Sequence, residues 1–302
     1  MKIAVGLDVD GSVQETIDRA RDLVDRGLTS LWASQIFGPD TLTVLALIGR
    51  ELPTVDLGTA VVPVQPRHPT MLAAQARTVQ DAIGGHLSLG VGLSHQVVVE
   101  GLWGLPFDRP ASYMREYLAA LAPLLRGEKI SVAGERVRVT TTGPLGPPNA
   151  DAPSLLVAAL GEKMLDLAGT VADGTVLWMT GPKTIAGHIV PRISAAAAAA
   201  GRPSPRVVCS APITVTADAA AARERINKTL AIYGTLPSYA AMFEREGATQ
   251  PADISLVGTR EEVLEHLATY AAAGVTEFSG AVIGSREERD ATLELLAGYP
   301  SA

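Results

Sequence analysis

Short apolar runs alternate with amphipathic stretches along almost the whole chain. The first run, residues 2–7, leads to Ser12 and Glu15, which have the spacing of a capping box and predict a helix through Arg26. The same succession of a buried strand and a helix then repeats to the end of the chain. The strands that this pattern predicts are residues 2–7, 30–34, 56–63, 86–91, 154–159, 175–179, 206–215 and 277–283.

Eight strands that alternate with helices predict one parallel sheet, and eight such units close a (β/α)8 barrel, the TIM-barrel fold. A doubly wound open sheet is the competing architecture. No Gly-x-Gly-x-x-Gly sequence opens the first predicted helix, which weakens a dinucleotide-binding interpretation of that kind. We therefore expect one barrel domain over residues 1–302.

Two stretches interrupt the alternation and predict insertions after strands four and seven. Residues 96–111 are longer than an ordinary loop between a strand and a helix, and they form a candidate lid. A small hairpin is expected at residues 130–142, followed by a proline-rich linker at residues 144–153. After the seventh strand, residues 231–256 have no clear pattern and are expected to form further helix and loop.

Composition narrows the class of protein. Hydrophobic residues make up 47% of the chain and aromatic residues only 4%, so we expect a large, aliphatic core. The net charge of −7 argues against a nucleic-acid surface. No apolar run approaches the roughly 18 residues of a transmembrane helix, and the N-terminus does not resemble a signal peptide. We therefore expect a cytoplasmic protein with no membrane partner, whose single cysteine, Cys209, is buried filler.

In a (β/α)8 barrel the active site lies at the carboxyl ends of the strands, so the residues that follow each strand are the candidates. They include few acids, and the chain has neither a His-Glu-x-x-His nor a Gly-x-Ser-x-Gly motif, so a metallohydrolase or a serine hydrolase is not expected. Small residues, backbone amides and histidines suit a large planar cofactor that carries the chemistry itself. Asp8, Gln35 and Trp178 lie at three strand exits and are candidates for substrate contacts, although packing alone would also explain Trp178.

Residues at two further strand exits are candidates for cofactor binding or catalysis. Gly161 and Glu162 open a helix directly after a strand, where free amides and the positive helix terminus favour a phosphate. A glycine at such a junction is more often only a turn residue. His95 follows a glycine-rich exit and is a candidate catalytic residue, with a structural role as the alternative.

The other four histidines have structural interpretations. His68 lies in a loop between Arg67 and a proline, and a solvated loop histidine is the alternative to a role in the site. His86 begins a strand, at the opposite end of the barrel from the predicted site. His188 and His266 lie on predicted helices and are expected at the surface.

Four segments have an order and spacing typical of a known family. They are Leu57-Gly-Thr-Ala-Val-Val-Pro63, Pro66-Arg-His-Pro69, Leu87-Ser-Leu-Gly-Val-Gly-Leu-Ser-His95 and Leu256-Val-Gly-Thr-Arg-Glu-Glu-Val263. Each motif is modest, but together they resemble the luciferase-like monooxygenase superfamily and, within it, the branch that uses coenzyme F420, a deazaflavin. The resemblance covers most of the chain.

This resemblance implies a barrel that holds the deazaflavin at its strand exits. In the family a cis peptide bond without proline supports the ring, and its counterpart here would join Ala60 and Val61. The family also binds the cofactor's phosphate after strand five, and the fourth-strand exit lines the ring edge. The remaining cofactor-binding residues implied in this way are Leu93, Ser94, His95, Leu160, Gly161 and Glu162.

Departures from the family bear on the substrate. The sugar-phosphate dehydrogenases of this branch carry an Asp-His pair where this chain has Gln35-Ile36, and a glutamate where it has His95. We therefore expect a different small molecule, with an unsaturated C=C or C=N bond, and His95 as the first choice of proton donor. The alternatives are an FMN-dependent monooxygenase and a barrel that binds a cofactor without turnover. The resemblance also implies a homodimer.

Overall fold

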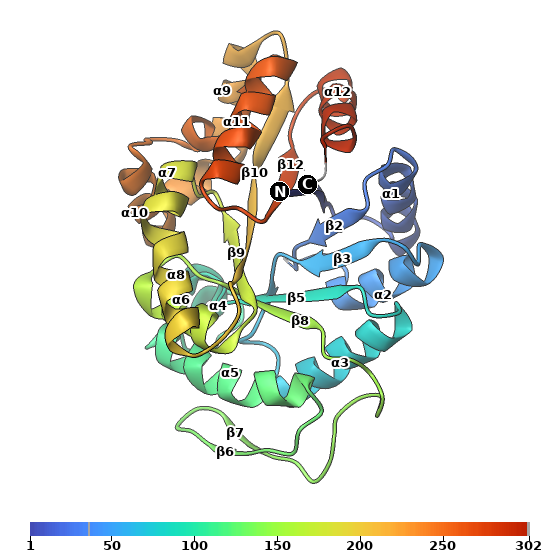
Figure 1. Ribbon diagram of the computed structural model, residues 1–302, viewed down its shortest axis with the longest axis vertical. Coiled ribbons are helices and arrows are strands. Elements are labelled where there is room, and N and C mark those ends of the chain that lie inside the picture. Colours follow the sequence, from blue (N-terminus) through green and yellow to red (C-terminus); the bar gives the residue numbers. More distant parts are fainter. Residues whose placement is uncertain (36, 301–302) are drawn as a thin grey trace.

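The computed structural model describes residues 1–35 and 37–300. Its centre is a closed barrel of parallel strands, drawn from blue to red in Figure 1. Neighbouring strands pair in chain order, β12 pairs with β1 and β10, and a β9–β10 pairing completes the ring. The barrel strands are β1 (Lys2–Leu7), β2 (Ser30–Ala33), β3 (Asp56–Thr59), β5 (Leu87–Gly92), β8 (Ser154–Ala158), β9 (Gly174–Trp178), β10 (Arg206–Val215) and β12 (Glu277–Val282).

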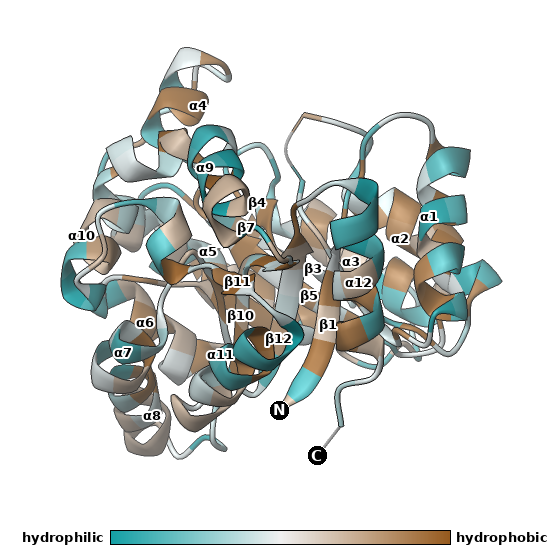
Figure 2. Cartoon of the chain, turned by 90° about the horizontal axis from the view of Figure 1, so that it is seen from above, coloured by the Kyte–Doolittle hydropathy of each residue, from teal (hydrophilic) through white to brown (hydrophobic). Residues whose placement is uncertain are grey.

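Helices surround this barrel, as the views down and across the molecule show (Figures 1 and 2). Their polar faces point outward and their aliphatic faces pack on the strands, which confirms the predicted (β/α)8 fold and aliphatic core. The main helices are α1 (Val13–Asp25), α2 (Thr41–Glu51), α3 (Pro69–Ala82), α5 (Pro110–Leu125), α6 (Glu162–Val171), α8 (Val190–Ala199), α11 (Arg260–Ala272) and α12 (Arg286–Ala297).

Local signals in the sequence explain where several helices begin. Ser12 and Glu15 form the predicted capping box of α1, and Thr259 caps α11 through the backbone N–H of Glu262. The segment before α8 begins with α7 (Pro182–Thr184) and passes through a π-helical turn, Ile185–Ile189. Such turns are rare, and they often occur near functional sites.

The third predicted strand, residues 56–63, is interrupted. It forms β3 and a separate short strand, β4 (Val62–Pro63), which pairs with β5 through Val62 and Val91. The peptide bond between Ala60 and Val61, in the gap, is cis, as the family resemblance implied.

Both predicted insertions are present. After β5, the chain forms α4 (Gln96–Gly101), then α5, and then an antiparallel hairpin of β6 (Ser131–Ala133) and β7 (Arg138–Thr140). After β10 it forms α9 (Ala219–Thr229), a 3₁₀ turn (Ala231–Thr235), α10 (Pro237–Glu246), a second 3₁₀ turn (Pro251–Ile254) and β11 (Leu256–Gly258). The strand β11 was not predicted, and it extends the sheet by pairing with β10.

Polar residues close the amino-terminal end of the barrel. The Glu277 carboxylate is only 3% exposed, and its Oε2 accepts a hydrogen bond from Arg206 Nη2 at 3.0 Å. Its Oε1 accepts from Trp32 Nε1 at 2.9 Å and from Ser30 Oγ at 2.7 Å. His86 lies at the same end, with Nδ1 2.9 Å from Asp56 Oδ1, which agrees with its structural interpretation.

Cys209 is fully buried, as predicted. Within residues 1–35 and 37–300, no helix combines the length and the apolar character needed to cross a membrane.

Candidate active site

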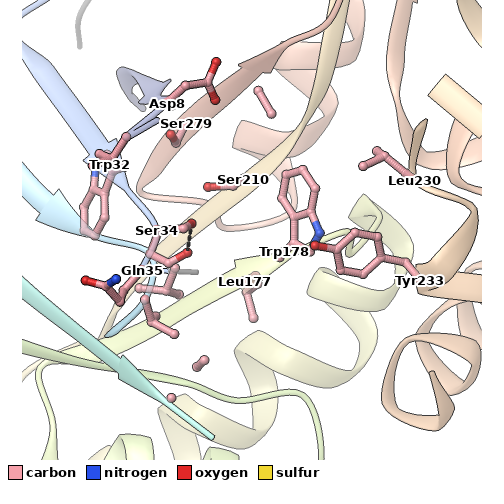
Figure 3. A pocket seen from close by; sticks show the side chains of 18 of the residues that line it. Asp8, Trp32, Ser34, Gln35, Leu177, Trp178, Ser210, Leu230, Tyr233 and Ser279 are labelled. Carbon is pink, nitrogen blue, oxygen red and sulfur yellow. Dashed lines mark hydrogen bonds between the residues drawn. The ribbon is translucent and has the colours of Figure 1, made fainter. Parts of the chain in front are cut away.

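A cavity of about 2050 Å³ opens at the carboxyl ends of the barrel strands. Part of its lining is drawn in Figure 3, where Asp8 and Ser279 lie on one side and Trp178 and Tyr233 on another. The structure brings nearly all the predicted site residues together around this cavity. Those that line it are Asp8, Gln35, Ala60, Val61, Leu93, Ser94, His95, Leu160, Gly161 and Trp178.

The backbone around the cis bond is held firmly against β2. Ser34 Oγ donates a hydrogen bond to Ala60 O at 2.6 Å, and the backbone N–H of Gln35 donates to Val61 O at 3.2 Å. The Ala60 N–H donates in turn to Ala33 O at 2.8 Å. Both carbonyls of the pair are therefore engaged by β2 and the residues that follow it.

Two glycines of β5 let this segment approach the neighbouring strand. A Cβ atom on Gly90 would lie 1.9 Å from the carbonyl oxygen of Thr59, and one on Gly92 would lie 2.6 Å from the Val61 side chain. Any larger residue would push the segment away from its position. The Gly-Val-Gly sequence of this strand is thus a steric requirement of the floor of the cavity.

Trp32 connects this floor to the closed end of the barrel. Its indole packs in a small apolar cluster against Ala60 and Val61, while its Nε1 donates to Glu277 at the other end. Gly58 makes room for the ring, since a Cβ atom there would lie 2.4 Å from Trp32 Cε3. Trp32 is therefore both a buried core residue and part of the cavity lining.

The start of α6 presents free backbone amides to the same cavity. Gly161 is the N-cap residue and provides no side chain to cap the helix. Among the described residues, none accepts a hydrogen bond from the N–H groups of residues 161–163. A Cβ atom on Gly161 would meet nothing within 4 Å. These features are those of an anion site at a helix terminus.

Two side chains near this helix terminus refine the predictions. The Glu162 side chain is exposed and does not line the cavity, and its Oε2 lies 3.9 Å from Arg192 Nη1. The predicted part of Glu162 in cofactor binding therefore rests on its backbone amide. His188 is half-buried rather than at the surface, because the π-helical turn directs its Nε2 to donate to Leu160 O at 2.8 Å. It thereby holds the loop that carries Gly161.

His95 lies at the β5 exit as the N-cap residue of α4, and its side chain does not cap that helix. It is half-buried, and this burial lowers the pKa of its imidazole below the usual 6.5. The ring is therefore neutral at pH 7. A neutral imidazole accepts a proton more readily than it donates one, which refines the expectation that His95 is the proton donor.

An aromatic wall, which we define as Trp178, Tyr233 and Tyr239, forms one side of the cavity. The ring centroids of Trp178 and Tyr233 are 5.7 Å apart, and those of Tyr233 and Tyr239 are 5.1 Å apart, both in edge-on arrangements. His95 continues the row, 6.0 Å from Tyr239. Met179, directly after Trp178, has a φ of 53°, which is uncommon outside glycine and is found most often where backbone geometry serves a site.

Sequence reasoning missed the two tyrosines of this wall. They lie in residues 231–256, which have no periodic pattern, and their position depends on how the second insertion folds back over the barrel. The available signal was composition: aromatic residues are scarce in this chain, yet two of them occur within seven residues of an otherwise featureless segment.

The loops at the rim are tied to one another. Gln35 Oε1 accepts from the Thr41 N–H at 2.7 Å, so the amide that was predicted to contact substrate also supports the start of α2. Ile36, the other residue of the replaced pair, lies outside the described residues. Arg67 Nη2 lies 3.0 Å from Asp40 Oδ1, and His68 Nδ1 accepts from the Thr70 N–H at 3.4 Å to cap α3.

The Asp8 carboxylate is exposed and lines the cavity, while its backbone oxygen accepts a hydrogen bond from Arg19. Among the residues that the structure describes, no group of three or more His, Cys, Asp or Glu side chains could hold a metal ion. The groups that line the cavity are thus backbone amides, hydroxyls, aromatic rings, one imidazole and ten charged side chains, five of them acidic and five of them arginines. This set suits an organic cofactor.

Comparison with known proteins agrees with this interpretation. Residues 1–277 match a family model described as luciferase-like monooxygenase. A Mycobacterium tuberculosis protein, provisionally named a coenzyme F420-dependent oxidoreductase, is 29% identical over 300 residues that cover 83% of this chain and 86% of the relative.

Solved structures show the same fold. The coenzyme F420-dependent tetrahydromethanopterin reductase of Methanopyrus kandleri superposes with a TM-score of 0.81 at 20% identity, covering 99% of this chain and 98% of the other. The oxygenating constituent of 3,6-diketocamphane monooxygenase from Pseudomonas putida, solved with FMN, superposes with a TM-score of 0.75 at 17% identity, covering 99% and 98%. At these identities the likeness concerns the fold.

Proposed function

The chain belongs to the luciferase-like monooxygenase family, and on that premise we propose that it is a coenzyme F420-dependent oxidoreductase. It would transfer hydride between the deazaflavin and a small organic substrate with an unsaturated C=C or C=N bond. The observation that carries the proposal is that three separate cofactor segments, residues 60–61, 93–95 and 160–161, line one cavity. The name of the Mycobacterium tuberculosis relative supports the choice of cofactor.

The residues present fit this cofactor. Ala60 and Val61 offer a backbone surface whose carbonyls are already bonded to Ser34 and Gln35, so a flat ring would meet a surface that need not rearrange. The amides of residues 161–163 would bind its phosphate, and His188 would keep their loop in position. When bound, the deazaflavin would supply a two-electron hydride donor or acceptor.

His95 is the chain's candidate for moving the proton that accompanies hydride transfer. It lines the cavity and has no hydrogen-bond partner among the described residues, so its ring nitrogens are free to contact a substrate. Because burial lowers its pKa, the imidazole would act as a base in the oxidising direction at pH 7. In the reducing direction it would donate a proton better as the pH falls.

Anaerobic turnover tests the proposal. The protein is mixed with reduced F420 and a panel of unsaturated ketones and imines, and the return of oxidised deazaflavin is followed by its absorbance. We expect oxidation that requires both the protein and an acceptor, and that slows about 100-fold in His95→Ala. An unchanged rate in His95→Ala would remove its catalytic role. A bound cofactor that no acceptor oxidises would argue against hydride transfer.

The second candidate function is an FMN-dependent monooxygenase, which the shared fold with the FMN-bound Pseudomonas putida protein favours. That reaction would need molecular oxygen and reduced FMN. Turnover that stops when oxygen is removed would support it, whereas deazaflavin oxidation without oxygen would support the first proposal.

We also propose that two copies of the chain form a homodimer. Most apolar side chains of α2 are internal, since Leu42, Leu45 and Ile48 are fully buried. Leu47 on the same helix is 43% exposed, however, and Met71 on α3 is 68% exposed. These two side chains lie on neighbouring helices and would suit a partner surface. Light scattering would test this, with a Leu47→Glu, Met71→Glu double variant expected to shift a dimer toward monomer.

A further inference from the structure

Aromatic side chains concentrate around the cavity far beyond their share of the chain. Only 4% of the residues are aromatic, with 3 tryptophans, 6 tyrosines and 4 phenylalanines in all. All three tryptophans, two of the tyrosines and two of the phenylalanines line this one cavity. The aliphatic core does not need them, so this distribution indicates a surface that is selected for a ligand.

The aromatic wall is built from two distant parts of the chain. Trp178 ends β9, while Tyr233 and Tyr239 come from the second insertion and pack behind it on Phe243 and Ile254. Figure 3 shows Trp178 and Tyr233 beside one another at the edge of the cavity. The edge-on contacts fix the rings relative to each other, so the wall presents a preformed aromatic surface.

The wall also carries donors that no described residue uses. Trp178 Nε1 is buried and lacks a hydrogen-bond partner among the described residues. The Tyr233 hydroxyl lies beside this indole nitrogen, whereas the Tyr239 hydroxyl has no hydrogen-bond partner among the described residues. Burial raises the pKa of both phenols, so they remain protonated. A buried donor without an acceptor is costly. A ligand with a carbonyl oxygen would satisfy such donors.

Charge is found elsewhere in the cavity. The arginines in its lining come from α1, α9 and α12. Arg19, Arg26 and Arg225 are paired with carboxylates, and Arg289 donates to the Val282 carbonyl at 2.9 Å. Arg286, at the start of α12, has no ion pair among the described residues. The hydrophobic side chains that pack with the wall include Met179, Phe243 and Ile254. An ionised group against the wall would lose water without a counter-charge, which is unfavourable.

We infer that the aromatic wall selects the substrate, and that the substrate class is a neutral, planar, conjugated ring that carries a carbonyl group. This inference rests on the proposed function, because it names the substrate of the same cavity. Tyr233 and Tyr239 are then specificity-determining residues, and His95 lies next to the bound ring at the end of the row.

Calorimetry with three bicyclic probes tests the inference on the full chain, with and without oxidised F420. Chromone is neutral, planar and conjugated, 1-decalone is a saturated ketone, and chromone-2-carboxylate is planar but charged. We expect chromone to bind at least tenfold more tightly than either other probe. Equal binding of chromone and 1-decalone, or tighter binding of the carboxylate, would overturn the inference.

Variants of the two tyrosines test whether the wall causes the preference for chromone. Tyr233→Leu and Tyr239→Leu should each weaken chromone about three- to tenfold and leave 1-decalone unchanged. Tyr233→Phe and Tyr239→Phe are conservative changes that keep the rings, so any loss of chromone affinity in these variants reports the role of the hydroxyl. Tyr299→Leu, outside the cavity lining, is the matched control and should bind chromone as the parent does. Chromone binding that is unchanged in both leucine variants would refute the role of the wall.

Cofactor titration separates the two proposals. If chromone binding depends on the tyrosines but F420 does not bind, the result supports the wall as a binding surface and refutes the proposed cofactor. If F420 binds and chromone is not distinguished from 1-decalone, the proposed function stands and the inference about the wall fails.

Discussion

Burial changes the pKa of single residues in the site. His95 is half-buried at the β5 exit, and the desolvation of its charged form lowers its pKa. Trp178 and the two tyrosines lie beside it, so the proton-transfer candidate and the aromatic wall form one continuous surface. The substrate would therefore contact a neutral imidazole and aromatic rings rather than fixed charges.

The ionisation of His95 can be measured directly. Because burial favours the neutral ring, its imidazole should titrate below pH 6.5. The five histidines give separate ring-proton signals in an NMR pH titration, and the signal that disappears in His95→Gln identifies this one. A midpoint at or above 6.5 would show that desolvation does not control the group.

The glycines of β5 give a second prediction at this scale. Gly90→Ala would place a methyl group where only 1.9 Å separates it from Thr59 O, so the segment before the cis bond must move. We expect a loss of about 1–3 kcal/mol in the free energy of unfolding, with weakened cofactor binding. Urea denaturation of Gly143→Ala, which would meet nothing within 4 Å, is the control. Equal stabilities of the two variants would contradict the packing.

At the scale of elements, the sequence predicted those helices and strands whose bounds are set by local patterns. The start of helix α1 and the bounds of strand β10 agree with the predictions, since a capping box marks the helix and a continuous apolar run marks the strand. The strand β11 and the turns around Tyr233 were not predicted from the sequence, because they are short and are stabilised by packing within the second insertion. The contact between His188 and Leu160 depends on a π-helical turn, which no local signal in the sequence indicated.

The start of α6 offers a test in which stability and affinity change in opposite directions. An Asp at position 161 would cap the helix and interact with its positive terminus, adding about 0.5 kcal/mol of stability. The same charge would repel a bound phosphate, so Gly161→Asp should weaken F420 at least tenfold.

Gly161→Asn is the matched control, since it caps the helix without charge. It should bind F420 much better than Gly161→Asp, and a deazaflavin riboside without phosphate should bind both variants alike. Equal F420 affinities for the Asp and Asn variants would show that no phosphate occupies this terminus. Thermal melts and fluorescence titrations provide the two measurements.

At the scale of the whole molecule, the barrel divides stability and ligand binding between its two ends. The amino-terminal end is closed by Glu277 and its partners, and the carboxyl end holds the cavity. Trp32 spans the interior between them, bonded to Glu277 at one end and packed on Ala60 and Val61 at the other. A change at the closed end should therefore be transmitted to the cavity floor.

Glu277→Ala tests this arrangement. Loss of the carboxylate leaves Arg206, Trp32 and Ser30 without their acceptor, so we expect a loss of about 2–4 kcal/mol in the free energy of unfolding. Asp166→Ala breaks the exposed pair with Arg192 and should cost only about 0.5 kcal/mol. Chemical denaturation compares the two variants, and a cost for Glu277→Ala as small as that for Asp166→Ala would show that the cluster does not hold the barrel closed.

The central claim is that the cavity is built for a deazaflavin. Equilibrium titration of the purified full chain with oxidised F420 and, in parallel, with FMN tests it most directly, with quenching of the tryptophans that line the cavity as the signal. The account predicts that F420 binds at least tenfold more tightly than FMN. Tighter binding of FMN, or no binding of F420, would contradict it.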